Sequence, residues 1–209
     1  MTGRAHRNLV VIASLATGCC CGQTLLAQAP GGCNEPIGSH VGEPGCYFTA
    51  SQPLGSIPPG PVYWHLYNYP TRPEAEAARG PNGTIVESFG KIWLYTIAEQ
   101  SWRPAAGERV AVIGPFPVTA GKQYTARCME AVFTPGMRAA IHRHSGPEGF
   151  YLLSGTQCLE TPDGITITQV GTELRRSVVW CCTIRPSPGS RWRTIGIRSV
   201  RVQNSFRLR

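Results

Sequence analysis

Residues 136–155, GMRAAIHRHSGPEGFYLLSG, constrain the expected fold of this chain more than any other segment. Two of the chain's five histidines, His142 and His144, stand here one residue apart, and Glu148 follows four residues later. Successive side chains alternate along a β-strand, so both imidazoles project from one face, with Cβ atoms about 6–7 Å apart. Two imidazoles at that separation can converge on one ion, with nitrogens about 2 Å from it.

The residues that follow the second histidine predict a turn. Ser-Gly-Pro at 145–147 is turn chemistry, and it would send the chain back antiparallel so that Glu148 enters beside the imidazoles. Two neutral nitrogens and one carboxylate, with open positions, form the facial triad of non-haem iron and also suit manganese, zinc or nickel. We therefore predict one divalent ion of these four at the two histidines and the glutamate. The alternative is a surface hairpin whose polar side chains face water.

The same residues resemble the first signature of the cupin superfamily. That signature reads glycine, five residues, His-x-His, three or four residues, glutamate, six residues and glycine. The chain supplies Gly136, His142, His144, Glu148 and Gly155 at these spacings. The resemblance implies a jelly-roll β-barrel in which the three polar side chains project inward and hold a metal. The chain is also similar to exported, single-barrel bacterial cupins of unassigned function.

The chain departs from the superfamily after this stretch. The second cupin signature supplies Pro-x-Gly and then a histidine as fourth ligand, but no histidine follows His144. His65 is the candidate for a substitute fourth ligand. Alternatively, His65 is a core histidine held by hydrogen bonds. Glu130, on the preceding strand-like stretch, is the candidate general base of an enzyme. The alternative for Glu130 is a solvated carboxylate.

The composition predicts a mainly β protein rich in turns. The 209 residues include 24 glycines and 18 prolines, with many β-branched and tyrosine residues. The alternation of VYWHLYNY at 62–69 predicts a strand. Residues 71–79, TRPEAEAAR, read as a capped short helix with proline in its first turn. Residues 84–98 read as two strands around a tight turn.

The later part of the chain predicts a sandwich or a closed barrel. From Glu108 onward, short strand-like stretches alternate with expected turn residues such as Pro115 and Gly155. Together with the resemblance, this predicts a cupin-type jelly-roll β-barrel preceded by a small α+β segment. The expected divisions are a signal peptide at 1–29, an N-terminal α+β extension at 30–104, the barrel at 105–185 and an irregular basic tail at 186–209.

The first thirty residues have the pattern of a secretory signal peptide. Arg4 and Arg7 precede the apolar run LVVIASLATG, and Ala-Gln-Ala at 27–29 provides a cleavage signal. We therefore expect a periplasmic or secreted protein. The residues before Cys19 also resemble a lipoprotein box, with Ala16 where leucine is expected. Lipidation at Cys19 would attach the protein to a membrane.

Export would determine which cysteines remain in the mature protein and whether they can form disulfides. Nine occur, and six remain after Cys19, Cys20 and Cys21 are removed with the leader. In an oxidising compartment, Cys33 and Cys46 are the preferred disulfide, closing a short loop near the mature N-terminus. Cys128 and Cys158 lie in strand-like stretches and are expected to be buried.

The net charge of +8 belongs to the tail. Nine arginines and no acidic residue lie from Arg175 to Arg209, so the rest of the chain sums to 8 − 9 = −1. Three function classes follow: a metal-binding barrel that binds a small polar molecule, with or without turnover; a metal-free ligand-binding or structural barrel; and an electrostatic binder acting through the tail. Export and the lack of regularly spaced aromatic residues in the tail disfavour nucleic acid. The cupin resemblance also implies a homodimer.

Overall fold

The computed structural model describes residues 33–57, 59–161, 164–170, 177–186, 195–197 and 199–201. Within these residues the chain forms twelve strands and one short helix, so the predicted mainly β fold is confirmed. The predicted signal peptide lies outside the described residues, as does most of the basic tail. No helix in the described part of the chain is long and apolar enough to span a membrane.

One sheet has four antiparallel strands in the order β3-β4-β2-β5. These strands are β2 (Val62–Tyr69), β3 (Gly83–Ser88), β4 (Lys91–Ala98) and β5 (Glu108–Phe116). The turn between β3 and β4 places Phe89 at φ 49° and Gly90 at φ 68°. Two central residues with positive φ are typical of a tight hairpin turn, so the hairpin predicted within 84–98 is confirmed.

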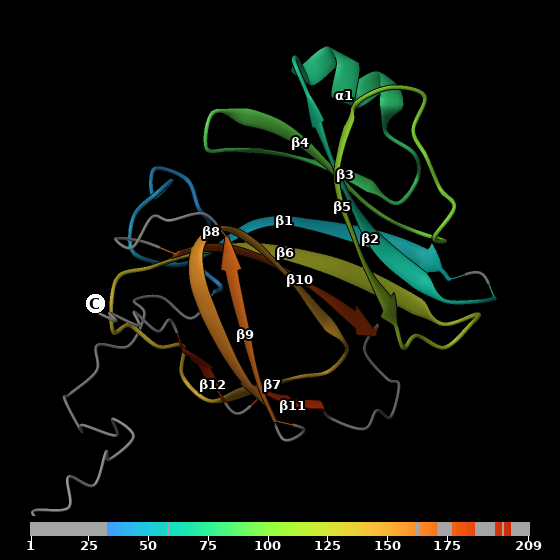
Figure 1. The fold of residues 1–209 in the computed structure, drawn as a ribbon. Helices are drawn as coiled ribbons and strands as arrows, with labels where there is room; N and C mark the ends of the chain where they lie inside the picture. Colours follow the sequence, from blue (N-terminus) through green and yellow to red (C-terminus); the bar gives the residue numbers. More distant parts are fainter. Residues whose placement is uncertain are drawn as a thin grey trace, which may run out of the picture.

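The helix α1 (Arg72–Ala78) covers the outer face of this sheet (Figure 1). The hydroxyl of Thr71 accepts a hydrogen bond from the backbone N–H of Glu74 at 3.4 Å, which caps the helix as the sequence predicts. Ala75 is fully buried in a cluster with Tyr67 and Leu94. This short helix therefore closes a small core on the side of β2 and β4 that faces away from β1 and β6.

The second sheet runs β1-β6-β10-β8-β12, with β9 also paired to β8. Its members are β1 (Gly45–Ser56), β6 (Gln123–Phe133), β8 (Glu148–Thr161), β9 (Gly164–Val170), β10 (Ser177–Pro186) and β12 (Ser199–Arg201). A separate two-stranded ribbon pairs β7 (His142–His144) with β11 (Ile195–Ile197). Residues 195–197 and 199–201 therefore form strands inside the tail, which we expected to be irregular. They satisfy backbone groups at the edges of β7 and β8.

The strand β8 corrects a predicted turn. Gly155 was expected to separate two strands, but it lies inside one continuous strand with φ 85°. β8 pairs with β10 as far as Ser154 and with β9 from Gly155 onward. The glycine therefore marks a bend at which β8 changes partners, since positive φ is readily available to glycine. Pro115, also expected in a turn, lies inside β5.

The two sheets pack face to face over one core. Trp64 and Leu66 of β2 pack against Tyr124 and Ala126 of β6 and Leu54 of β1. Strands from both sides of the predicted boundary at 104/105 also pair with each other, β1 with β6 and β2 with β5. The predicted extension and the predicted barrel therefore share sheets and a core. The described strands form separate sheets, so the finer prediction of a closed jelly roll stays a prediction.

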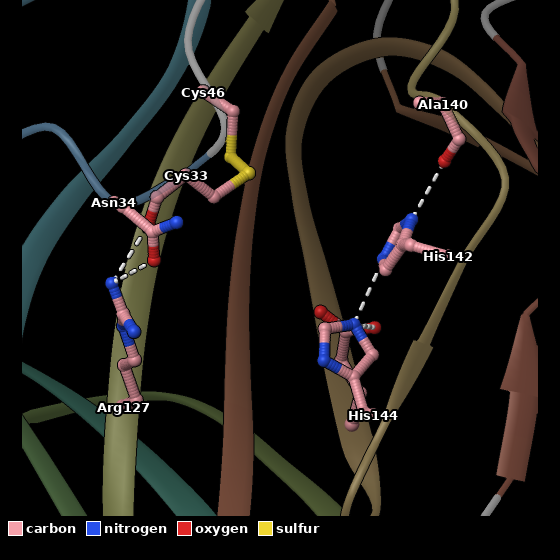
Figure 2. Close-up of a disulfide and its surroundings, with 8 residues drawn as sticks. Cys33, Asn34, Cys46, Arg127, Ala140, His142 and His144 are labelled. Atoms are coloured by element: carbon pink, nitrogen blue, oxygen red, sulfur yellow. Dashed lines mark hydrogen bonds and ion pairs between the residues drawn. A yellow bond between two sulfur atoms is a disulfide. The ribbon is translucent and has the colours of Figure 1, made fainter.

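The disulfide predicted between Cys33 and Cys46 is confirmed, with a Cα–Cα distance of 4.7 Å (Figure 2). It ties the segment before β1 to a core cluster that contains Met129, Ala131 and Phe133. The guanidinium of Arg127 donates to the Cys33 carbonyl at 3.1 Å, which holds the same segment. Cys128 and Cys158 are buried, as expected.

Removing this disulfide is expected to lower the free energy of unfolding by about 3 kcal/mol, because the closed loop restricts the unfolded chain. The variant is Cys33→Ala/Cys46→Ala, measured by urea denaturation. Reduction of the wild-type protein should give the same loss, and the variant should be insensitive to reductant. A reductant effect of similar size in the variant would show that another pair of cysteines is responsible.

Candidate metal centre

Three side chains from the motif converge at the junction of β7 and β8. The Nε2 atoms of His142 and His144 are 2.8 Å apart, and the His144 Nε2 is 3.0 Å from the Glu148 carboxylate. One ligand atom from each of the three residues lies within 4.8 Å of the other two. The sequence predicted these three residues together, and the structure brings them together.

The burial of this cluster decides between the two interpretations of the hairpin. The side chain of His144 is 9% exposed and that of Glu148 is 4% exposed. A surface hairpin would leave both in water, so that alternative is wrong. A buried carboxylate costs free energy unless a positive charge or hydrogen-bond donors compensate it, and a bound metal ion would provide that compensation.

A backbone contact fixes the orientation of the His142 ring. Its Nδ1 lies 2.7 Å from the carbonyl oxygen of Ala140 (Figure 2). Because a carbonyl oxygen only accepts, Nδ1 carries the proton, and the neutral ring has its lone pair on Nε2. Metal-ligating histidines commonly show this arrangement, in which the second nitrogen fixes the tautomer and the ring orientation.

The donor set fits a divalent transition-metal ion. Two ligand atoms that are each about 2.1 Å from one ion and at right angles to each other lie about 3.0 Å apart. The separations of 2.8 and 3.0 Å between neighbouring donors match this value. All three donors lie within 4.8 Å of one another, so His142, His144 and Glu148 could hold one ion after small side-chain adjustments, and three protein ligands would leave other positions open.

The local fold that presents these ligands differs in one respect from the prediction. β7 pairs with β11, with Ile195 opposite His144, and in the described residues it forms no ladder with β8. The loop before β7 is anchored instead by Met137, whose N–H donates to the Thr134 carbonyl at 3.0 Å. Gly136 has φ 82° in that turn, which explains a glycine at the first position of the motif.

A cavity of about 360 Å³ adjoins the cluster, between β5 and the start of β8. Both His144 and Glu148 line it, and Pro147 and Phe150 lie beside them. The remaining lining residues are Ile113, Gly114, Pro115, Phe116, Pro117, Gly146, Gly149, Leu159 and Thr161. The volume is in the range of small-molecule sites, so a molecule in this cavity can reach the metal-binding residues.

The β5 wall of this cavity was not predicted from the sequence. A Cβ atom added at Gly149 would lie 2.7 Å from the ring of Phe116 and 3.2 Å from Ile113. A larger residue at position 149 would therefore have to displace the side chains of Phe116 and Ile113, which glycine allows to pack against the β8 backbone. The sequence offered one weak signal, a glycine directly after the glutamate, but nothing in it indicated the partner strand.

Glu130 does not belong to this centre. It is fully buried on β6, and its carboxylate accepts a hydrogen bond from the hydroxyl of Ser88. By alternation it shares a face with Cys128, which packs in the core between the two sheets. Phe150 packs with Met129 on the opposite face. Both sequence interpretations of Glu130, a general base at the metal and a solvated carboxylate, are therefore wrong.

His65 also lies apart from the cluster, so the candidate fourth ligand is not at the metal centre. The side chain is fully buried, and its Nε2 is 2.9 Å from the carbonyl oxygen of Glu99. Its ring meets that of Trp102 edge-on, with centroids 5.3 Å apart. The alternative interpretation, a histidine hydrogen-bonded in a core, is confirmed.

His65 is expected to make the protein less stable at acid pH. Burial lowers the pKa of His65, against a smaller raising effect of the Glu99 carbonyl, and the nearby Arg103 and Arg109 lower it further. The unfolded chain therefore binds a proton that the folded protein does not, and stability falls as the pH drops through about 6.5. The contribution of His65 to the slope of the unfolding free energy against pH is at most about 1.4 kcal/mol per pH unit.

The measurement is the free energy of unfolding between pH 7.5 and 5.0 for wild type and for His65→Gln. The variant should be less stable at neutral pH but should show a shallower dependence on pH. Parallel curves for the two proteins would contradict the assignment of this dependence to His65.

We find no match for this chain among protein-family models, curated proteins or solved structures. What can be said of function therefore depends on the three converging side chains and on the cavity beside them.

Proposed function

We propose that this protein binds one divalent transition-metal ion through His142, His144 and Glu148, and a small molecule with a polar group in the adjoining cavity. The observation that carries the proposal is the convergence of two imidazole nitrogens and one carboxylate, with His144 and Glu148 almost completely buried. Three protein ligands leave positions open for water or for a bound molecule.

The bound ion would supply Lewis-acid polarisation of an oxygen on that molecule. The protein's own residues fix the ligand geometry, through the Ala140 carbonyl at His142, and restrict solvent through the apolar walls of the cavity. Among the described residues that line the cavity, only His144, Glu148 and Thr161 have polar side chains. The proposal is therefore one of binding, without a separate general acid or base.

We extend the proposal to a cupin-type fold and to an extracytoplasmic location. Two observations support the cupin resemblance: Gly136 and Gly155, the outer glycines of the signature, both adopt positive φ, 82° and 85°. The disulfide between Cys33 and Cys46 supports export, because such bonds persist mainly in oxidising compartments.

Metal loading tests the proposal directly. The protein, purified without chelator, is dialysed against manganese, iron(II), nickel or zinc, and its metal content is measured by elemental analysis. We expect one equivalent of ion per chain for at least one of the four. Metal content at the level of the dialysis buffer for all four would contradict the proposal and favour a metal-free ligand-binding barrel.

A further inference from the structure

The cavity next to the metal centre has a chemical character that selects its occupant. We propose that it binds a monoanionic carboxylic acid with an apolar body, the carboxylate directed to the metal and the body packed between β5 and β8. This inference rests on the proposed metal binding, and it adds the class of ligand.

Charge is the first property of the cavity that selects its ligand. Among the described residues that line the cavity, Glu148 is the one acidic residue, and there is no lysine or arginine. With neutral histidines, the two positive charges of a divalent ion less the single negative charge of Glu148 leave one positive charge. One monoanion balances that charge. A cationic molecule would be repelled by this positive charge, with no further acid to compensate it. A dianion would leave one negative charge in apolar surroundings, which is costly.

Shape and polarity are the second property that selects the ligand. Away from the metal ligands, the described walls consist of apolar side chains and backbone, with Ile113 and Phe116 from β5 and Phe150 and Leu159 from β8. The one further polar side chain among the described lining residues is that of Thr161. A sugar or an amino acid would bury several hydroxyl or ammonium groups here without enough partners. An alkyl or aromatic body gains free energy from burial against such walls, and a volume of about 360 Å³ accommodates one ring or a short chain.

The experiment uses the full protein loaded with cobalt(II), whose visible absorption reports changes at the metal. The probes are benzoate, acetate, benzyl alcohol and benzylamine. We expect benzoate to change the spectrum and to bind at least about tenfold more tightly than acetate, because the ring is buried in addition to the carboxylate. Benzyl alcohol should bind more weakly than benzoate, and benzylamine should leave the spectrum unchanged.

Two variants test whether the cavity is the site. Leu159→Trp fills the cavity and should weaken benzoate binding at least about tenfold while cobalt content stays at one per chain. Ile167→Trp, on the exposed face of β9 outside the cavity, is the matched control and should bind benzoate like wild type. Thr161→Phe fills the same cavity from another position, and it replaces Leu159→Trp in this test if Leu159→Trp does not fold.

The outcomes separate this inference from the proposed function. Failure of the wild-type protein to bind cobalt, together with failure to bind manganese, iron(II), nickel or zinc, would overturn both. Stoichiometric cobalt together with equal affinity for benzoate and acetate, or with binding of benzylamine, would overturn the ligand class alone. Benzoate binding that is unchanged in both cavity-filling variants would place the ligand elsewhere and contradict the inference.

Discussion

The His142→Ala/His144→Ala variant is expected to lose metal binding, with an affinity at least about a hundredfold below wild type. The two substitutions remove both nitrogen donors and leave Glu148 as the remaining protein ligand. Loss of a single outer hydrogen bond to a ligand already costs about 10–100-fold in metal affinity, so loss of two ligands should cost more. Elemental analysis and calorimetric titration of the protein measure the effect.

The control for this experiment is His40→Ala. His40 lies at the surface, where it pairs with Glu35 and Glu43, far along the chain from the motif. It should retain the full metal content, which separates site-specific binding from general coordination by histidine. A further variant, Glu148→Gln, preserves size but removes the charge, and it should weaken binding without abolishing it. Equal metal content in wild type and in the double variant would remove the site described above.

Trp64→Ala is expected to destabilise the protein by about 3–5 kcal/mol, the cost of replacing a large buried aromatic residue. Trp64 has no exposed surface, and it packs in the core between the two sheets. Its ring meets that of Tyr95 edge-on at 5.3 Å, which adds a favourable aromatic contact. Denaturant unfolding measures the change, with fluorescence and far-ultraviolet circular dichroism as independent probes.

The position of Trp64 makes this a test of the fold as well as of stability. β2 precedes the predicted barrel, yet its tryptophan shares a core with β6. The two sheets should therefore unfold in a single transition, with the two probes coincident in both proteins. Ile165→Ala on exposed β9 is the control and should change stability by less than about 0.5 kcal/mol. Separate transitions for the two probes would show that the sheets are independent.

Local features of this fold were predictable because neighbouring residues determine them. Alternation in residues 62–69 predicted β2, with Trp64 and Leu66 on one face and Tyr67 and Tyr69 on the other, and the structure buries both faces. The cap at Thr71 and the turn between β3 and β4 follow from local backbone chemistry. The convergence of His142, His144 and Glu148 was also predictable, because these three residues are separated by one and three residues along the chain.

Long-range features were not predictable, because alternation states which side chains share a face but not what that face meets. Glu130 alternates with its neighbours as expected in a strand. Its side chain, however, lies on the face of β6 that packs into the core between the sheets, and not on the face of the candidate metal centre. The pairing of β7 with β11 joins residues about fifty positions apart. The approach of β5 to Gly149 likewise depends on tertiary contacts that no local pattern encodes.

We propose that His142, His144 and Glu148 share one ion. The decisive experiment is anomalous scattering from crystals of the metal-loaded protein, recorded at the absorption edge of the ion. A shared ion should give one strong peak about 2.0–2.2 Å from a nitrogen of each histidine and from a carboxylate oxygen of Glu148. A peak bound by other residues, or metal-loaded crystals with no peak at these three side chains, would contradict it.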